Sequence, residues 1–422
     1  MIKVATEQKS AVVRGILAAG VGKRGSKPLE PELIDEILIE LNAKSAPADT
    51  VGALFGGLLM KGLTPQERKL EKAFSAGTFT DPHKLARVLA PDAPPDIQNF
   101  CGRLLAGEEL DRREALTLGR FLLSDLPGHG ARGMAASVLR VRYETPDEYA
   151  GLLAAIQETL TPAFTVDVPG GDPVIQIAEP FDGVDHSYLI TPLIAKHLQD
   201  SGYRAVMLAG RNSGPKYGNN ILDLVKDLKL TVASGNAMLT GDKPGLGWVI
   251  NQPDLSPALD RWVDIRRRIV KRPFPATLER FVNPCSANIL IASAFHPPYG
   301  EKMITIAENA GYPAAVIVRN GLEGTLAFPL KRPVKILCSA RQESGEYRRA
   351  ELTLDPADFV KEDIPVEEKL DAPSLAENVR LIREYHSQNK TGNRLFNWRV
   401  EFTVHGITRA LDRLKELKGA DS

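Results

Sequence analysis

The first 160 residues carry apolar positions at helical spacing. Within residues 31–44 the apolar side chains recur three and four positions apart, at Leu33, Ile34, Ile37, Leu38 and Leu41, which is the pattern of an amphipathic helix. Pro31 falls in the first turn of that helix, where proline is tolerated. Residues 48–60 form a second helical stretch that is rich in Gly and Ala. The N-terminal part is therefore predicted to be a helical domain.

From about residue 165 the pattern changes to short β-rich runs separated by helical stretches. The runs lie at 173–178, 205–210, 287–295, 314–320 and 334–340, and the helical stretches between them lie at 188–201, 219–229, 257–272 and 299–311. This alternation is typical of an α/β domain with a mostly parallel central sheet, whose ligand site lies at the carboxyl ends of the strands. The tail returns to helix at 373–388 and 401–418.

Two helix starts divide the helical region into similar parts. Thr-Pro-Gln-Glu at 64–67 and Thr-Pro-Asp-Glu at 145–148 both place Thr as an N-cap with Glu three residues later. They lie 81 residues apart, and identical residues recur at that offset: Leu29 and Leu110, Leu41 and Leu122, Gly52 and Gly133, Leu58 and Leu139. A duplicated unit is predicted, with chance as the alternative. We expect an extra helical unit at 1–95, a helical domain at 96–165 and an α/β domain with C-terminal helices at 166–422.

Composition excludes several classes of protein. The 53 basic and 53 acidic residues cancel, so an anion site must be a local patch. Three scattered cysteines, Cys101, Cys285 and Cys338, argue against a disulfide framework or a structural zinc site. The chain has no apolar signal core and no run near 18 apolar residues. We therefore expect a soluble, cytoplasmic protein.

One loop has the arrangement of an anion site. A short strand leads into a turn at Asp182-Gly183, and a helical run at 188–197 follows. Backbone N–H groups of such a loop, with a helix N-terminus, hold anions. However, Glu179 adds negative charge there and Pro180 lacks an N–H. The sequence therefore indicates a fold more strongly than a reaction.

A second loop, GRNSGPKYG at 210–218, follows the run at 205–210. It brings four polar side chains to the crevice expected at the carboxyl ends of the strands: Arg211, Asn212, Ser213 and Lys216. The alternative is an ordinary connection between a strand and a helix.

The segments LLAGEELDRREA (104–115) and LRVRYETPDEYAGLL (139–153) are followed along the chain by ASGNAMLTG, RPFPATLERFVNP (272–284) and HPPYGEKM. The order of these motifs resembles the anthranilate phosphoribosyltransferase family, whose fold relatives are the pyrimidine nucleoside phosphorylases. The resemblance covers about 100–422. It implies phosphoribosyl pyrophosphate as a substrate, Mg²⁺ as a cofactor and a homodimer formed through the N-terminal helices.

The resemblance also implies a substrate site. Asp182 and Gly183 match the end of the family's Gly-Thr-Gly-Gly-Asp-Gly loop, and Thr191 matches the last hydroxyl of its Asn-x-Ser-Thr element. The implied substrate-binding residues are Asp182, Gly183, Thr191, Gly210, Arg211, Asn212, Ser213, Lys216 and Arg266. Arg266 would hold the carboxylate of anthranilate. Glu323 is what remains of the family's Asp-Glu magnesium pair.

Several positions depart from the family pattern. Residues 178–181 replace the first four positions of the glycine-rich loop, Ala209 and Ser256 each stand where the family has His, and Glu279-Arg280 replace a Gly-Pro that lines the aromatic pocket. A single carboxylate is a poor Mg²⁺ site unless substrate phosphates complete the coordination. These departures indicate weakened activity toward anthranilate.

The departures match a paralogous branch of the family that is linked to nucleic-acid binding. That branch has motifs like PFDG…LITPL (180–193), GVGKRG (20–25) and GLEG (321–324). The residues that would contact nucleic acid are Lys23, Arg24 and Lys27 in a loop, and Arg267, Arg268, Lys271 and Arg272 at a helix end. Positions 268 and 272 would share one helix face, as would 267 and 271. A flexible loop and a solvated helix face are the alternatives.

Two functions are therefore expected. The first is phosphoribosyl transfer from phosphoribosyl pyrophosphate to an unidentified acceptor, with the phosphates held by the residues named above. The second is a catalytically degenerate binding protein on the same fold, with nucleic acid as its ligand; zero net charge weighs against it. The doubled helical unit leaves two assemblies open, the homodimer that the resemblance implies and a monomer in which the second copy replaces that contact.

Overall fold

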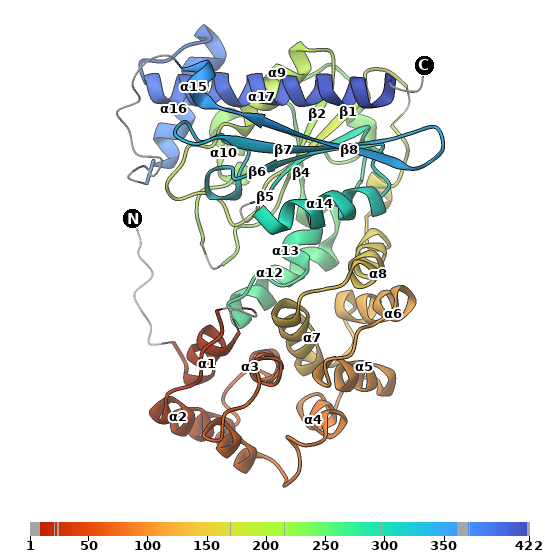
Figure 1. The fold of residues 1–422 in the computed structure, drawn as a ribbon, viewed down its shortest axis with the longest axis vertical. Coiled ribbons are helices and arrows are strands. Elements are labelled where there is room, and N and C mark those ends of the chain that lie inside the picture. Colours follow the sequence, from red (N-terminus) through yellow and green to blue (C-terminus); the bar gives the residue numbers. More distant parts are fainter. Residues whose placement is uncertain are drawn as a thin grey trace. The chain divides into compact units, whose positions relative to one another are not determined.

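A computed structural model describes residues 9–20, 22, 25–168, 170–214, 216–294, 297–360, 370 and 372–419. The chain forms two compact units. The helical unit comprises Met1–Glu158, Ser213–Pro215 and Arg261–Leu278, and the α/β unit comprises Thr159–Asn212, Lys216–Asp260 and Glu279–Ser422. The N-terminal helices are red to yellow in Figure 1, and the sheet and C-terminal helices are green to blue.

The helical unit contains the helices predicted at 31–44 and 48–60 and the helix predicted to start at 145–148, together with others that were not predicted. Its elements are α1 (Ala11–Ala19), α2 (Pro31–Asn42), α3 (Ala48–Lys61), a 3₁₀ turn (Glu67–Ala73), α4 (Pro82–Leu89), α5 (Pro95–Leu105), α6 (Arg112–Leu123), α7 (His129–Arg142), α8 (Pro146–Gln157), most of α12 (Pro257–Ile269) and α13 (Pro275–Leu278). Residues 261–278, which the sequence assigns to the α/β domain, group with this unit. Trp262 of α12 explains why, since its indole N–H donates to the Leu122 carbonyl at the end of α6 (3.1 Å).

The helices follow the 81-residue offset. Helices α2 and α6 begin and end 81 residues apart, and so do α3 and α7. The third pair differs, because α8 is a full helix whereas Glu67–Ala73 is only a 3₁₀ turn. The structure therefore supports a duplicated unit rather than a chance match.

Each copy is held by one buried glutamate. Glu67 accepts the N–H groups of Leu29 (2.9 Å) and Thr64 (2.8 Å) and the ammonium of Lys61 (2.7 Å). In the second copy, 81 residues on, Glu148 accepts the N–H groups of Leu110 (3.1 Å) and Thr145 (2.9 Å) and pairs with Arg142. Both glutamates also complete the reciprocal bond of a capping box.

The two copies pack against each other through equivalent positions. A Cβ on Gly52 would lie 2.2 Å from the Gly130 carbonyl oxygen, and a Cβ on Gly133 would lie 1.8 Å from that of Asp49. Position 49 of one copy thus meets position 52 of the other, in both directions. This is the reciprocal contact of a two-fold interface, formed here between α3 and α7 within one chain.

The α/β unit contains one eight-stranded sheet in the order β3-β4-β2-β1-β5-β6-β7-β8. Its strands are β1 (Val174–Ala178), β2 (Arg204–Ala209), β3 (Thr231–Val232), β4 (Trp248–Asn251), β5 (Ile289–Ala294), β6 (Ala314–Arg319), β7 (Val334–Arg341) and β8 (Tyr347–Leu354). The pairs from β3 through β6 are parallel, and β7 and β8 are antiparallel. The predicted fold class is confirmed. Strands β3, β4 and β8 had not been predicted.

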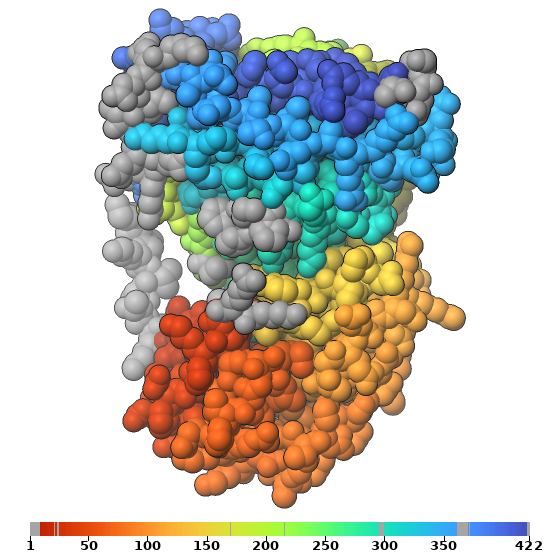
Figure 2. Space-filling view, in the orientation of Figure 1, coloured from red at the N-terminus to blue at the C-terminus, as the bar shows by residue number. Residues whose placement is uncertain are grey.

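Helices cover the sheet on both faces (Figure 1). They are α9 (Thr191–Asp200), α10 (Ile221–Leu228), α11 (Gln252–Leu255), α14 (Pro297–Asn309), α15 (Pro356–Phe359), α16 (Leu375–Gln388) and α17 (Arg394–Gly419). One core joins α9, α16 and α17 to alternate residues of the strands, among them Ile177, Met207 and Val316. Part of α17, in dark blue, lies at the surface in Figure 2.

The structure bears on two expectations from composition. Cys101, Cys285 and Cys338 are buried and form no disulfide. Among the helices that the structure describes, none combines the length and apolarity that a membrane span needs.

Candidate anion-binding site

Three loops at the carboxyl edge of the sheet meet at one carboxylate. Glu323, in the loop after β6, accepts the N–H groups of Asp185 (3.1 Å) and His186 (2.6 Å) in the loop after β1. The ammonium of Lys216, in the loop after β2, forms an ion pair with the same carboxylate. Burial alone would raise the pKa of Glu323, but the bonds from Lys216, Asp185 and His186 hold that pKa below its ordinary value. The carboxylate is therefore charged and fully engaged.

A second carboxylate occupies the start of α9. Glu179 follows β1 directly and accepts the hydroxyl of Thr191, the first residue of α9, and the N–H of Leu326. Burial raises the pKa of Glu179, and the two hydrogen bonds and the nearby Arg280 oppose that shift. Thr191, expected to contact a phosphate, instead donates to the protein's own carboxyl group.

The loops after β1 and β2 are joined to each other. The backbone groups of Val184 and Asn219 exchange two hydrogen bonds (2.8 and 3.0 Å), and the Gly218 N–H donates to the Asp182 carbonyl (3.0 Å). Gly183 between them has φ +76°, and a Cβ there would lie 2.3 Å from the Gly218 oxygen. Gly183 is thus required by a close approach of two backbones.

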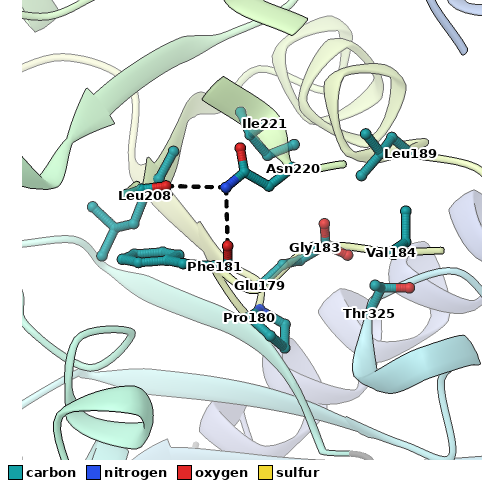
Figure 3. Close-up of a pocket in the computed structure, with 12 residues that line it drawn as sticks. Glu179, Pro180, Phe181, Gly183, Val184, Leu189, Leu208, Asn220, Ile221 and Thr325 are labelled. Atoms are coloured by element: carbon teal, nitrogen blue, oxygen red, sulfur yellow. Dashed lines mark hydrogen bonds between the residues drawn. The ribbon is translucent and has the colours of Figure 1, made fainter. Parts of the chain in front are cut away.

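The side chain of Asn220 also ties these loops. Its amide donates to the Phe181 carbonyl (2.9 Å) and to the Gly210 carbonyl (3.0 Å), as Figure 3 shows. The ring of Phe181 packs on Gly210, where a Cβ would meet it at 2.5 Å. The cavity between the loops has a volume of about 10 Å³, which is room for about one water molecule. None of Asp185, His186, Lys216 and Glu323 lines this cavity.

The remaining implied residues divide between the units. In the α/β unit, Arg211 donates from Nε to both carboxylate oxygens of Asp260 (3.0 Å each), and the Asn212 amide donates to the Gly218 carbonyl. Ser213 and Arg266 group with the helical unit, and both are buried. The structure thus brings together Asp182, Gly183, Asn212, Lys216 and Glu323, whereas Arg211 is held by an acid outside this group.

Comparison with known proteins agrees with the implied fold. No family model matches the chain. An uncharacterized protein of Aquifex aeolicus is 22% identical over 230 residues, and the anthranilate phosphoribosyltransferase of Deinococcus radiodurans is 24% identical over 223 residues. These alignments cover 54% and 52% of this chain, and 68% and 64% of the relatives. The chain therefore spans about two thirds of the length of the curated relatives that it matches.

Solved structures decide the fold. The anthranilate phosphoribosyltransferase of Thermus thermophilus aligns with a TM-score of 0.58 at 20% identity, over 75% of this chain and 91% of that one. The Saccharomyces cerevisiae enzyme, in complex with PRPP and Mg, aligns with a TM-score of 0.54 at 14% identity, over 76% and 97%. This chain has the anthranilate phosphoribosyltransferase fold.

On this anthranilate phosphoribosyltransferase fold, the side chains present do not fit a resident Mg²⁺. Within the described ranges, no three His, Cys, Asp or Glu side chains come together as metal ligands. Glu323, the implied metal carboxylate, is engaged by two N–H groups and a lysine ammonium. A cation beside that ammonium would be repelled.

The basic residues that the structure describes at the end of α12 do not share one helix face. Helix α12 ends at Ile269 and Val270 has φ +46°, so the expected i,i+4 pairs of 267 with 271 and 268 with 272 do not form. Lys271 is 6% exposed, it donates to the Ser137 hydroxyl, and burial lowers its pKa to about 7. Arg268 donates twice to Asp49 (2.8 and 2.6 Å).

Of the other basic residues, Arg267 pairs with Asp264 (3.6 Å), and Lys27 and Arg272 are exposed. Lys23 and Arg24 lie outside the described residues. Lys271 and Arg268 were both expected at a nucleic-acid surface. In the structure, Lys271 is buried and Arg268 is bonded to Asp49.

Sequence reasoning missed several residues that build the site. Asp185 and His186 contribute only backbone N–H groups, which carry no sequence signature. Asn220 had a usable signal, because Asn220 and Asp223 form a capping box at the start of α10. Its second role, the hydrogen bonds to the Phe181 and Gly210 carbonyls, is visible only in the three-dimensional structure.

Proposed function

We propose that this chain is a phosphoribosyltransferase-like protein that binds a phosphorylated pentose, such as phosphoribosyl pyrophosphate, at the carboxyl edge of its sheet. The observation that carries the proposal is the convergence of the Lys216 ammonium and the N–H groups of Asp185 and His186 on the two oxygens of one carboxylate, that of Glu323. Two successive N–H groups with a cation are a donor set suited to phosphate oxygens. The phosphoribosyltransferase fold supports the same ligand class.

The proposed reaction transfers the pentosyl group to an acceptor. The bond from C1′ to the pyrophosphate oxygen breaks with its electron pair leaving on the pyrophosphate, the acceptor's nucleophilic atom bonds to C1′, and the acceptor's proton passes to the released pyrophosphate or to water. The protein contributes mainly position and charge to such a step. Lys216 and the two N–H groups would hold the departing phosphate and stabilise its growing charge.

The acceptor is expected to differ from anthranilate. Glu279 and Arg280 stand where the resemblance places an apolar Gly-Pro, and they are buried at 3% and 8% exposure. Arg280 donates to the Ser293 carbonyl (2.9 Å), and Gln252 donates to Glu279 (3.3 Å). Charged, hydrogen-bonded groups do not suit an aromatic ring, since their bonds would be lost on its entry.

The small cavity between Phe181, Gly210 and Asn220 is not the proposed binding place, because about 10 Å³ cannot hold a sugar phosphate. The ligand is expected to bind instead at the partly exposed pair of Lys216 and Glu323.

Calorimetric titration with phosphoribosyl pyrophosphate, with and without Mg²⁺, tests the proposal. The full chain is expected to bind in the micromolar range, and Lys216→Ala is expected to weaken binding at least about tenfold by removing a charged donor. Lys335→Ala, which removes an exposed lysine paired with Glu351, is the matched control and should bind as wild type. Absence of binding by the folded wild type would overturn the proposal.

The nucleic-acid alternative receives less support from the described residues. Lys271 is buried, and Arg268 is neutralised by Asp49. Binding of single-stranded and duplex oligonucleotides at two salt concentrations tests it, since phosphate contacts give a steep salt dependence. Salt-dependent binding together with no binding of the sugar phosphate would favour the alternative.

We also propose that the chain is a monomer rather than the homodimer that the resemblance implies. The α3–α7 contact already pairs the two helical copies reciprocally, at Gly52 with Gly130 and Gly133 with Asp49. If a homodimer uses this contact, the second copy takes the place of the second chain. Light scattering should give the mass of a single chain across a range of concentrations; a concentration-independent dimer would contradict this.

A further inference from the structure

The oxyanion position between the three loops is filled by the protein itself. Both carboxylate oxygens of Glu323 are used, one on the His186 N–H and the other on the Asp185 N–H and Lys216. We propose that Glu323 is an internal substitute for a phosphate group, and that a phosphate of the ligand displaces it on binding. This inference rests on the proposed function, because it concerns the same donor set.

The conformation of Glu323 favours displacement. The residue lies in a single 3₁₀ turn, Leu322–Gly324, and has φ +53°. A non-glycine residue in this left-handed region is strained by about 1–2 kcal/mol. Its side chain is 17% exposed and that of Lys216 is 18% exposed. A ligand can therefore reach the ion pair from solvent.

Glu179, the other carboxylate at this edge, is not expected to move. It is buried and bonded to Thr191 and Leu326, and these partners are not the donors that Glu323 holds. Displacement is therefore assigned to Glu323 alone.

A resident metal would give Glu323 the opposite role. As a metal ligand, Glu323 would strengthen phosphate binding, and its loss would weaken it. As an internal anion it competes, and its loss would strengthen binding of phosphate even without metal. The two roles predict changes of opposite sign for the same variant.

The test is calorimetric titration of inorganic pyrophosphate, in EDTA, into the full chain and its variants. Glu323→Gln keeps the shape of the side chain but removes the charge that holds Lys216, and about tenfold tighter binding is expected. Glu323→Asp keeps the charge but shortens its reach, and an intermediate gain is expected. Adding Lys216→Ala to Glu323→Gln should abolish the gain.

Glu351→Gln is the matched control. Glu351 also lies between two cations, Lys335 and Arg319, but on β8. Its loss changes net charge equally and should leave pyrophosphate affinity unchanged. Thermal melts establish that each variant is folded.

The outcomes separate this inference from the proposed function. Tighter binding by Glu323→Gln but not by Glu351→Gln supports the inference. Equal or weaker binding by Glu323→Gln, with wild type binding pyrophosphate, overturns the inference and leaves the proposed function standing. Binding by neither wild type nor Glu323→Gln overturns both.

Discussion

Three glutamates in two regions of this molecule have the same kinds of partner. Glu67 and Glu148 in the helical unit, and Glu323 at the sheet edge, each accept two backbone N–H groups and pair with one basic side chain. In the helical unit one of the two N–H groups lies three residues before the glutamate, inside a capping box. At the sheet edge, both come from residues about 137 positions away.

The three carboxylates differ in which groups would be left without a partner if the carboxylate moved away. Glu67 and Glu148 are fully buried, so their departure would leave N–H groups and a cation unsatisfied in the interior. Glu323 is partly exposed and strained, and an incoming anion can take its place. The same kind of donor set therefore stabilises the start of a helix in one region and forms an exchangeable anion site in the other.

Substitution of the buried glutamates should have the largest effect on stability. Glu148→Gln leaves Arg142, itself 12% exposed, with only its longer ion pair to Glu109 (3.8 Å), and should lower the free energy of unfolding by about 3 kcal/mol. Glu67→Gln should act in the same direction through Lys61. Denaturant unfolding measures both, and Glu323→Gln, expected to cost about 1 kcal/mol or less, is the comparison. Equal losses for Glu148→Gln and Glu323→Gln would contradict the distinction.

The contact between the helical copies should tolerate little change. Gly133→Ala would place a Cβ 1.8 Å from the Asp49 oxygen, and overpacking of this kind costs about 1–3 kcal/mol. Gly52→Ala should cost a similar amount, because its position is equivalent. Gly392→Ala, with no atom within 4 Å of the added Cβ, is the control. The same unfolding measurement would refute the reciprocal contact if Gly133→Ala matched the control.

The smallest effect is expected at Glu179 and should depend on pH. Burial raises the folded-state pKa of Glu179 above its ordinary 4.5, so the folded state binds this proton more tightly than the unfolded state. Its contribution to stability is present at low pH and is lost as pH rises from 4.5 through the folded-state pKa. Glu179→Gln, which is always neutral, should raise the melting temperature by a few degrees at pH 8 and hardly at pH 4. A larger gain at pH 4 would contradict the assignment.

The sequence predicted those parts of the molecule that rest on local signals. The α2 helix follows from its apolar spacing, and the duplicated unit follows from an 81-residue offset that α2, α3, α6 and α7 reproduce. The buried strands β1, β2, β5, β6 and β7 were visible as apolar runs. Strand β4 is only four residues long, and β8 at the sheet edge consists of half-buried and exposed residues, so the sequence pattern predicted neither.

The site was predictable only in part, because its chemistry depends on pairing between distant residues. Lys216 and Glu323 were both identified, one as a phosphate contact and one as a metal ligand, but nothing in the sequence showed that they pair. Thr191 was identified without its acceptor, Glu179, which is 12 residues away on the other side of the loop. In the sequence, the negative charge of Glu179 counts against an anion site. In the structure, the negative charge of Glu323 lies on the very groups that would bind the anion.

The central claim is that Glu323 holds the place of a phosphate. A crystal structure of the full chain with pyrophosphate bound tests it most directly. We predict phosphate oxygens on the N–H groups of Asp185 and His186 and on Lys216, with the Glu323 side chain turned away toward solvent. Pyrophosphate bound elsewhere, with Glu323 still on those three groups, would contradict the claim.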